Sequence, residues 1–295
     1  MTEAPSVKGF WDEETGSWQY VFHDPATMQG AIVDPVWDFD PRSGGTSTKA
    51  ADLILDHVAE AGIDIAWILD THPHADHFSA AAYLKERLGA PTAIGEHVVR
   101  VQKLWQEIYH LPELPTDGRQ WDRLLADGDT FAVGRIPVRV MHSPGHTLAS
   151  VSYVAGDAAF IHDTLMMPDS GSSRADFPGG DAHELYRSIQ AILALPDETR
   201  LFIGHDYAPG GRAPLCVATV AEQKAHNIHL KDDPDAAAFV ERRTARDRTL
   251  PLPKLMLAAL QINIRGGRKP EPEPNGRAYL KLPLDYFEAR GEPDR

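Results

Sequence analysis

The feature that most constrains this chain is a histidine-rich loop, His72-Pro73-His74-Ala75-Asp76-His77. Pro73 has no backbone N–H and disfavours a helical conformation at the residue before it, so the three imidazoles cannot line one face of a helix. An apolar run at residues 63–69 is typical of a buried strand, and residues 80–88 repeat apolar side chains at helical spacing. Loops between a strand and a helix carry many functional sites in α/β proteins. Imidazole and carboxylate groups at this density favour a metal site over a histidine-rich surface turn.

Length and composition limit the classes of protein to consider. A chain of 295 residues with 42% hydrophobic residues can bury one large core with an appendage. Its formal net charge of -14 argues against a nucleic-acid partner, which favours a basic face. No apolar run has the length of a transmembrane helix, and residues 1–6 lack the blocks of a signal peptide, so we expect a cytoplasmic protein without a membrane partner. Cys216 is the only cysteine, which excludes an intrachain disulfide and a Cys-x-x-Cys redox pair.

Two blocks of short strands alternate with helices along the chain. The predicted strands lie at residues 17–22, 30–34, 63–69 and 91–95 in the first block, and at 131–133, 136–141, 150–154, 158–161 and 200–203 in the second. The predicted helices lie at residues 49–61, 96–109, 182–195, 217–230 and 234–246, and a Pro- and charge-rich tail follows. Two strand blocks with outer helices indicate a sandwich of sheets flanked by helices.

Three more candidate ligands each follow a predicted strand. They are His146 in a Pro-Gly-His-Thr turn, Asp163 and His205. Each residue by itself is weak evidence for a metal ligand. A histidine after a glycine turn is more often a surface residue, and an aspartate after a strand is often a helix cap. Side chains at strand ends meet along one edge of a sandwich, so we expect the three to converge with the loop at 72–77.

This order of ligands resembles the metallo-β-lactamase superfamily over roughly residues 10–207. The resemblance implies an α/β fold, the αββα sandwich of two mixed β-sheets flanked by helices. We expect a catalytic domain at residues 1–215 and a helical extension and tail at 216–295, packed on the same domain. In the superfamily's two-zinc hydrolases, the equivalents of His72, His74 and His146 hold one metal. Those of Asp76, His77 and His205 hold the other, and the equivalent of Asp163 bridges the two.

Three segments look like the persulfide dioxygenase branch, the iron-dependent relatives of glyoxalase II. They are residues 173–180, 204–207 and 275–281. That branch implies oxidation of glutathione persulfide by O2 and water to sulfite and glutathione. It also implies one Fe(II) per chain, held by the counterparts of His72, His146 and Asp163. The remaining residues of the motif would be neighbours of the metal or remnants of a second site: His74, Asp76, His77 and His205.

The metal is left open by the ligands themselves. Two imidazoles and one carboxylate on one face of iron leave positions for dioxygen and a sulfur substrate, whereas zinc has no redox chemistry. The chain nevertheless retains every residue of a two-metal site, so a dinuclear zinc hydrolase of a glutathione thioester or lactone is the alternative. A non-enzymatic module that binds sulfur species is a third reading. His162 replaces a glycine of many members and is expected as a buried imidazole bonded to backbone, and Ser172 replaces a cysteine of the animal enzymes.

Candidate substrate contacts follow from the same resemblance and from the loop after His205. Tyr207 is expected to place a hydroxyl near the substrate sulfur, with surface packing as its alternative, and Asp206 is expected to order neighbouring histidines. Arg212 and Lys224 are candidates to pair with the substrate's carboxylates, with solvated charges as the alternative.

Arg174 is also a candidate substrate-binding residue, and we expect it to brace the site through a buried carboxylate, either Asp176 or one around Asp163. The family resemblance and the apolar segment at 255–260 also predict a homodimer. No sequence motif identifies whether glutathione or another thiol carries the persulfide.

Overall fold

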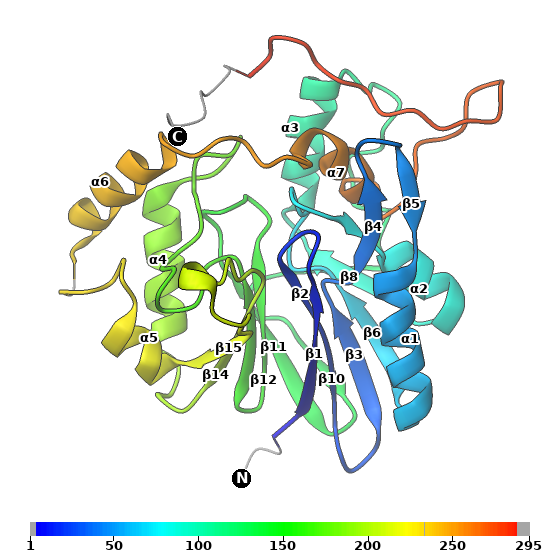
Figure 1. Cartoon of the computed structure of the whole chain (residues 1–295). Coiled ribbons are helices and arrows are strands. Elements are labelled where there is room, and N and C mark those ends of the chain that lie inside the picture. The colour runs from blue at the N-terminus through cyan, green and yellow to red at the C-terminus, as the bar shows by residue number, and fades with distance from the viewer. Residues whose placement is uncertain (1–3, 233, 288–295) are drawn as a thin grey trace.

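The computed structural model describes residues 4–232 and 234–287, and these form two six-stranded sheets between layers of helix. Figure 1 shows the sheets facing each other in the centre, with α1 (Lys49–Ala61) and α2 (Ala81–Leu88) outside one sheet and α4 (Ala182–Leu193) and α5 (Val220–His226) outside the other. The expected αββα sandwich is therefore confirmed.

The first sheet has the strand order β1-β2-β3-β6-β8-β9. Its strands are β1 (Ser6–Asp12), β2 (Ser17–His23), β3 (Gln29–Val33), β6 (Asp64–Leu69), β8 (Thr92–Gly95) and β9 (Arg123–Leu125). The pairs β1–β2 and β2–β3 are antiparallel, and the remaining pairs are parallel. Ile54 and Val58 of α1 and Leu84 of α2 are buried against its outer face, as the helical spacing of these apolar residues predicts. The parallel strands direct their carboxyl ends, and the loops that follow them, to one edge.

The second sheet has the order β10-β11-β12-β13-β14-β15. Its strands are β10 (Thr130–Val133), β11 (Ile136–His142), β12 (Val151–Ala155), β13 (Ala158–His162), β14 (Arg200–Ile203) and β15 (Val217–Thr219). Only β13 and β14 pair in parallel, with α4 as the crossover between them. Asp181 caps α4 by accepting the backbone N–H groups of His183 and Glu184, which fixes where this helix begins.

Aromatic side chains fill the space between the two sheets. Phe22 of β2 stacks on Phe160 of β13 with ring centroids 4.9 Å apart, and Phe160 stacks on Phe202 of β14 at 5.2 Å. All three are at most 5% exposed. Because each such ring contributes about 1.5–3 kcal/mol when buried, this layer fixes the sheets to each other and holds the loops at their edge in place.

The carboxyl-terminal segment packs back on the first half of the chain. After α6 (Ala236–Asp247) comes α7 (Met256–Asn263), which lies beside a small sheet of β4 (Val36–Asp40), β5 (Gly45–Ser47) and β7 (Phe78–Ser79). The Asn263 side-chain amide donates to the carbonyls of His74 and His77, each at 2.8 Å, and accepts the Ser79 N–H at 2.8 Å. The histidine-rich loop is therefore held by a helix almost two hundred positions away in the sequence.

Most predicted elements are confirmed, and the helix expected at 217–230 is wrong in both bounds. Val217–Thr219 pairs with β14 as a strand instead, because its β-branched ends suit a sheet. Thr219 and Glu222 then form a capping box, which starts α5 at Val220. Helix α3 (Val98–Tyr109) begins two residues later than predicted, and the tail runs along the surface at the top of Figure 1. The division at residue 215 stays a prediction.

None of the helices in residues 4–232 and 234–287 combines the length and the hydropathy that crossing a bilayer requires. Residues 1–3, part of the amino-terminal segment in which no signal peptide is expected, lie outside the described residues.

Candidate metal centre

All seven predicted ligand residues meet at one edge of the sandwich, where β6, β11, β13 and β14 end. They form overlapping groups whose possible ligand atoms lie within 4.8 Å of one another: His72, His146 and Asp163; Asp76, Asp163 and His205; and His74, Asp76 and His77. All are buried except Asp76, which is half-buried. The candidate ligands follow four separate strands and meet at one place, as their positions after predicted strands led us to expect.

The first group points two bare imidazole nitrogens at one carboxylate oxygen. Thr71 donates its hydroxyl to a carboxylate, so the Nδ1 of His72, 3.0 Å from that hydroxyl oxygen, must be the donor to it. Likewise, His146 Nδ1 donates to the Arg174 carbonyl at 2.9 Å. Burial lowers the pKa of both histidines, which favours neutral rings with the proton on Nδ1. Both Nε2 atoms are then unprotonated, at 3.7 Å and 3.5 Å from Asp163 Oδ2.

These spacings and groups fit a metal ion. Two ligand atoms at ~2.1 Å from one ion lie about 3.0–3.4 Å apart, slightly less than the separations from Asp163 Oδ2. The Nε2 of His72 is buried and has no hydrogen-bond partner among the described residues. Burial and neighbouring imidazoles also hold the pKa of His72 well below its ordinary value, which keeps the lone pair free. A set of two imidazoles and one carboxylate suits Fe(II) and Zn²⁺ alike.

Asp76, His77 and His205 form a second group, which is hydrogen-bonded within itself and to Asp163. Asp76 Oδ2 lies 2.7 Å from His77 Nδ1 and 2.6 Å from His205 Nε2, and the other nitrogen of His205 lies 2.6 Å from Asp163 Oδ1. These are hydrogen-bond lengths, shorter than the separation of two ligands of one metal. Burial alone would lower the pKa of His205, but the two carboxylates outweigh it and raise that pKa well above its ordinary value. His205 is therefore a charged link between the two aspartates.

His74 uses its Nε2 on Asp34, which follows β3, although a possible ligand atom of this residue also lies within 4.8 Å of those of Asp76 and His77. Its Nε2 lies 3.0 Å from Asp34 Oδ1, and this carboxylate, opposing the effect of burial, raises the pKa of His74 to about 9. Asp34 also accepts the Thr71 N–H at 2.7 Å and the Thr71 hydroxyl at 2.8 Å. Asp34 thus orients His72 through Thr71. This role of Asp34 was not predicted, although Asp34 stands at the end of the strand expected at residues 30–34, much as the candidate ligands stand after theirs.

His162 is buried, as predicted, but its partners are side chains rather than backbone. Its Nε2 lies 2.9 Å from the Thr164 hydroxyl and 3.1 Å from the Ser143 hydroxyl, and its ring centroid is 5.1 Å from that of His72. Burial lowers its pKa to about 3. The expected bond to backbone was therefore wrong: Nε2 faces two hydroxyls, and Nδ1 has no partner among the described residues.

A cavity of about 790 Å³ opens above the first group. Its lining includes His146, Asp163, His205 and Phe177. Arg246 and Lys254 line it from the carboxyl-terminal segment, and both are exposed and make no ion pair within the described ranges. No sequence motif singled out these two cations, because only folding brings α6 and the loop after it to the cavity.

Tyr207 lines the cavity and Arg174 braces its wall. Tyr207 is 68% exposed, and its ring is stacked near that of His205 with centroids 6.3 Å apart. Arg174 pairs with Asp176 through two bonds of 2.7 Å and 3.0 Å, and its guanidinium lies 5.0 Å from the centre of the Phe177 ring. Its charge is therefore already committed to holding the wall.

The structure gives three other predicted residues different surroundings. The Asp206 carboxylate bonds Arg212 and the N–H groups of Ala208 and Leu215, and no hydrogen bond to a histidine is found for it in the described part of the chain. Arg212 joins Asp206 to Asp169, so it fastens the loop after His205 rather than facing the cavity.

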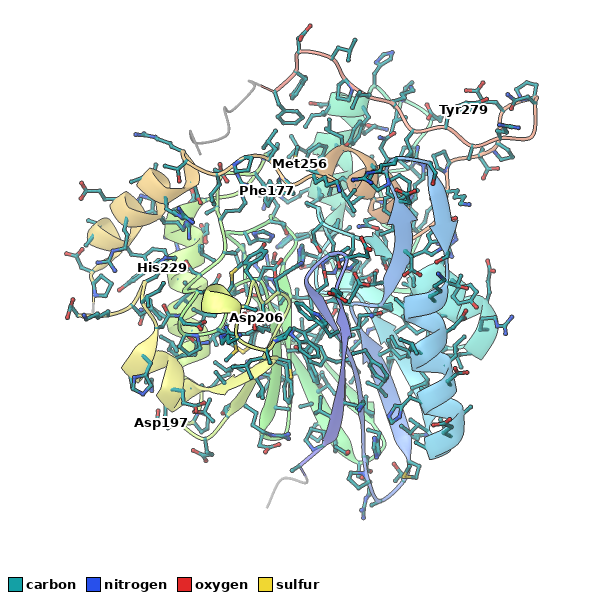
Figure 2. All side chains as sticks on the ribbon, viewed as in Figure 1. Phe177, Asp197, Asp206, His229, Met256 and Tyr279 are labelled. Atoms are coloured by element: carbon teal, nitrogen blue, oxygen red, sulfur yellow. The ribbon has the colours of Figure 1, made fainter. Side chains whose placement is uncertain are left out.

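Lys224 also lies away from the cavity. It pairs with Asp197 at 2.7 Å, and Figure 2 shows Asp197 near α5, well separated from Phe177. Lys224 is therefore paired elsewhere and is not among the residues that line the cavity.

Comparison with known proteins places the chain in a family. A model of the metallo-beta-lactamase superfamily matches residues 39–205, more than half of the chain. A beta-lactamase hydrolase-like protein of Xylella fastidiosa is 64% identical over 286 residues, and the chain spans 66% of that protein's length. Glyoxylase B2 of Dictyostelium discoideum is 42% identical, with 97% of this chain and 99% of that protein covered.

Two further relatives bear on the branch. The human mitochondrial persulfide dioxygenase ETHE1 is 28% identical over 251 residues, which cover 84% of this chain and 83% of that protein. The crystal structure of ETHE1 from Myxococcus xanthus matches 89% of this chain and all of that one, with 30% identity and a TM-score of 0.71. With its ligand order, its sandwich and these matches in agreement, the chain belongs to the metallo-beta-lactamase superfamily, with persulfide dioxygenases among its homologues.

Proposed function

We propose that this chain is a persulfide dioxygenase. The reaction takes glutathione persulfide, O2 and water to glutathione, sulfite and two protons, so the terminal sulfur loses four electrons and O2 gains them. A single Fe(II) held by His72, His146 and Asp163 would supply the redox chemistry. The relatives named persulfide dioxygenase support the reaction class.

One observation carries the choice of a single metal. The atoms of the first group are spaced as ligands of one ion, whereas those of the second group are at hydrogen-bond lengths from each other. A site with one ion and three protein ligands leaves positions open for two reactants, which a dioxygenase requires.

The cavity supports an anionic substrate of peptide size. Its volume of about 790 Å³ falls within the range of small-molecule sites. Arg246 and Lys254 are available to pair with the carboxylates of glutathione, and they replace Arg212 and Lys224 as our candidates. Tyr207 remains the candidate for a hydroxyl beside the reacting sulfur, and Asp206 and Arg212 would hold its loop.

A zinc hydrolase of a glutathione thioester is the second candidate. The glyoxylase and hydrolase-like names of two relatives favour it, and so does the complete set of seven ligand residues. His77 Nε2, buried and without a partner in the described ranges, is an available ligand atom for a second ion.

One experiment separates the two. Protein of determined metal content is loaded with iron or with zinc, and both forms are given glutathione persulfide and S-lactoylglutathione. The proposal expects oxygen uptake and sulfite with the iron form and the persulfide. Hydrolysis of the thioester by a protein holding two zinc ions, with no oxygen uptake by the iron form, would refute it. The homodimer and the cytoplasmic location stay predictions.

A further inference from the structure

The second group of candidate ligands has an additional neighbour from the amino-terminal hairpin. Ser17, the first residue of β2, is 1% exposed. Its hydroxyl oxygen lies 2.9 Å from Asp76 Oδ2, 3.1 Å from His205 Nε2 and 3.4 Å from His77 Nδ1. One hydroxyl thus touches all three residues that would hold a second ion.

The backbone fixes Ser17 in this place. The N–H of Trp18 donates to the carbonyl of Gly204 at 2.8 Å, and the N–H of Asp206 donates to that of Gly16 at 3.3 Å. Ser17 and His205 are therefore bridge partners on adjacent segments. The Thr15 hydroxyl oxygen, which is bonded to Asp12, also lies 2.8 Å from the Ser17 oxygen, so that oxygen has a neighbour in its own turn as well.

We propose that Ser17 closes the second metal position and so makes this a one-metal site. The inference rests on the proposed function, because it concerns the number of ions there. An ion shared by Asp76 and His205 needs these ligand atoms about 3.0–3.4 Å apart, with itself between them. They are 2.6 Å apart, and Ser17 donates to the Asp76 oxygen involved. Ser17 therefore completes a hydrogen-bonded cluster that leaves no room for a second ion.

The predicted consequence is that removing the hydroxyl reopens the position. Ser17→Ala and Ser17→Gly both delete this oxygen, and His77 Nε2 still has no partner in the part of the chain that the structure describes. Asp76 and His205 can then move apart around an ion. Ser143→Ala is the matched control, since Ser143 is an equally buried serine whose hydroxyl contacts Ser152 and His162 but none of the second group.

The test is metal stoichiometry. Metal-free wild-type, Ser17→Ala, Ser17→Gly and Ser143→Ala proteins are dialysed against excess Zn²⁺, and separately Co²⁺, and bound metal is counted by elemental analysis. Cobalt absorption spectra report whether a second environment appears, and thermal melting of each metal-free protein reports folding. We expect one equivalent in wild type and in Ser143→Ala, and a rise toward two in both Ser17 variants, with new cobalt bands.

Two results would overturn the inference. Wild type binding two equivalents would do so even if no variant folds, and so would folded Ser17 variants that stay at one. Oxygen uptake is measured separately on iron-loaded wild type. A wild type that binds one ion but consumes no oxygen refutes the proposed reaction and leaves the role of Ser17 intact.

Discussion

The first half of the ligand cluster is the first group: His72, His146 and Asp163. The second half is the second group: Asp76, His77 and His205. The two halves contain the same residue types but differ in their hydrogen-bond partners. His72 and His146 each donate the N–H of Nδ1 to an uncharged oxygen and leave Nε2 bare toward Asp163. In the other half, His205 uses both nitrogens on carboxylates. The difference teaches that the partners of a histidine decide whether it can bind a metal, since imidazole needs a free lone pair to do so.

The largest effect should come from breaking the first half. His72→Ala removes a bare ligand nitrogen, so we expect loss of the bound metal and a fall of more than about a hundredfold in turnover. Elemental analysis and oxygen uptake check this. His226→Ala, an exposed histidine of α5, is the control. A His72 variant that keeps its metal and its rate would contradict the assignment.

The second largest effect should come from Asp34, which orients His72 of the first half. Asp34→Asn keeps the shape of the side chain but removes the carboxylate to which Thr71 and His74 are bonded. We expect the metal dissociation constant to rise about 10- to 100-fold, measured by competition with a chelator. Asp40→Asn, an exposed aspartate at the end of β4, should leave it unchanged. Equal affinities in all three proteins would exclude Asp34 from orienting His72.

A smaller effect is expected at the cavity rim, outside both halves. Arg246→Ala and Lys254→Ala should each raise KM for glutathione persulfide about fivefold with little change in kcat, because an exposed charge pair contributes about 1 kcal/mol or less. Steady-state oxygen uptake measures both constants. Lys224→Ala, whose lysine pairs with Asp197, is the matched control. If only Lys224→Ala changed KM, Lys224 rather than Arg246 and Lys254 would be the residue that pairs with the substrate's carboxylates.

The smallest effect should come from the second half. Under the one-metal proposal His77→Ala leaves the first three ligands in place, so we expect one bound ion and a loss of only about two- to fivefold through loosening of Asp76. Metal content and turnover are measured on the same sample. A loss as large as that of His72→Ala, with metal content falling by half, would favour the two-metal hydrolase.

The fold was largely predictable, because strand alternation and helical spacing are local. The helix predicted at 217–230 failed for a tertiary reason: Val217–Thr219 pairs with β14, which periodicity does not report. Among the substrate contacts, Arg174 lies where it was expected, beside Asp176. Lys224 does not line the cavity, because nearness in sequence to His205 says little about the direction in which α5 points.

By itself, the sequence determined the superfamily, the sandwich and the seven residues that gather at its edge. Their types and order do this because strand ends in such a sheet meet at one place. Only the tertiary structure decided how those residues divide. Three further residues reach the cluster without any motif that joins them to it: Asp34 after β3, Ser17 of β2 and Asn263 of α7. Hydrogen bonds between distant segments set which lone pairs stay free, and that is a property of the folded chain.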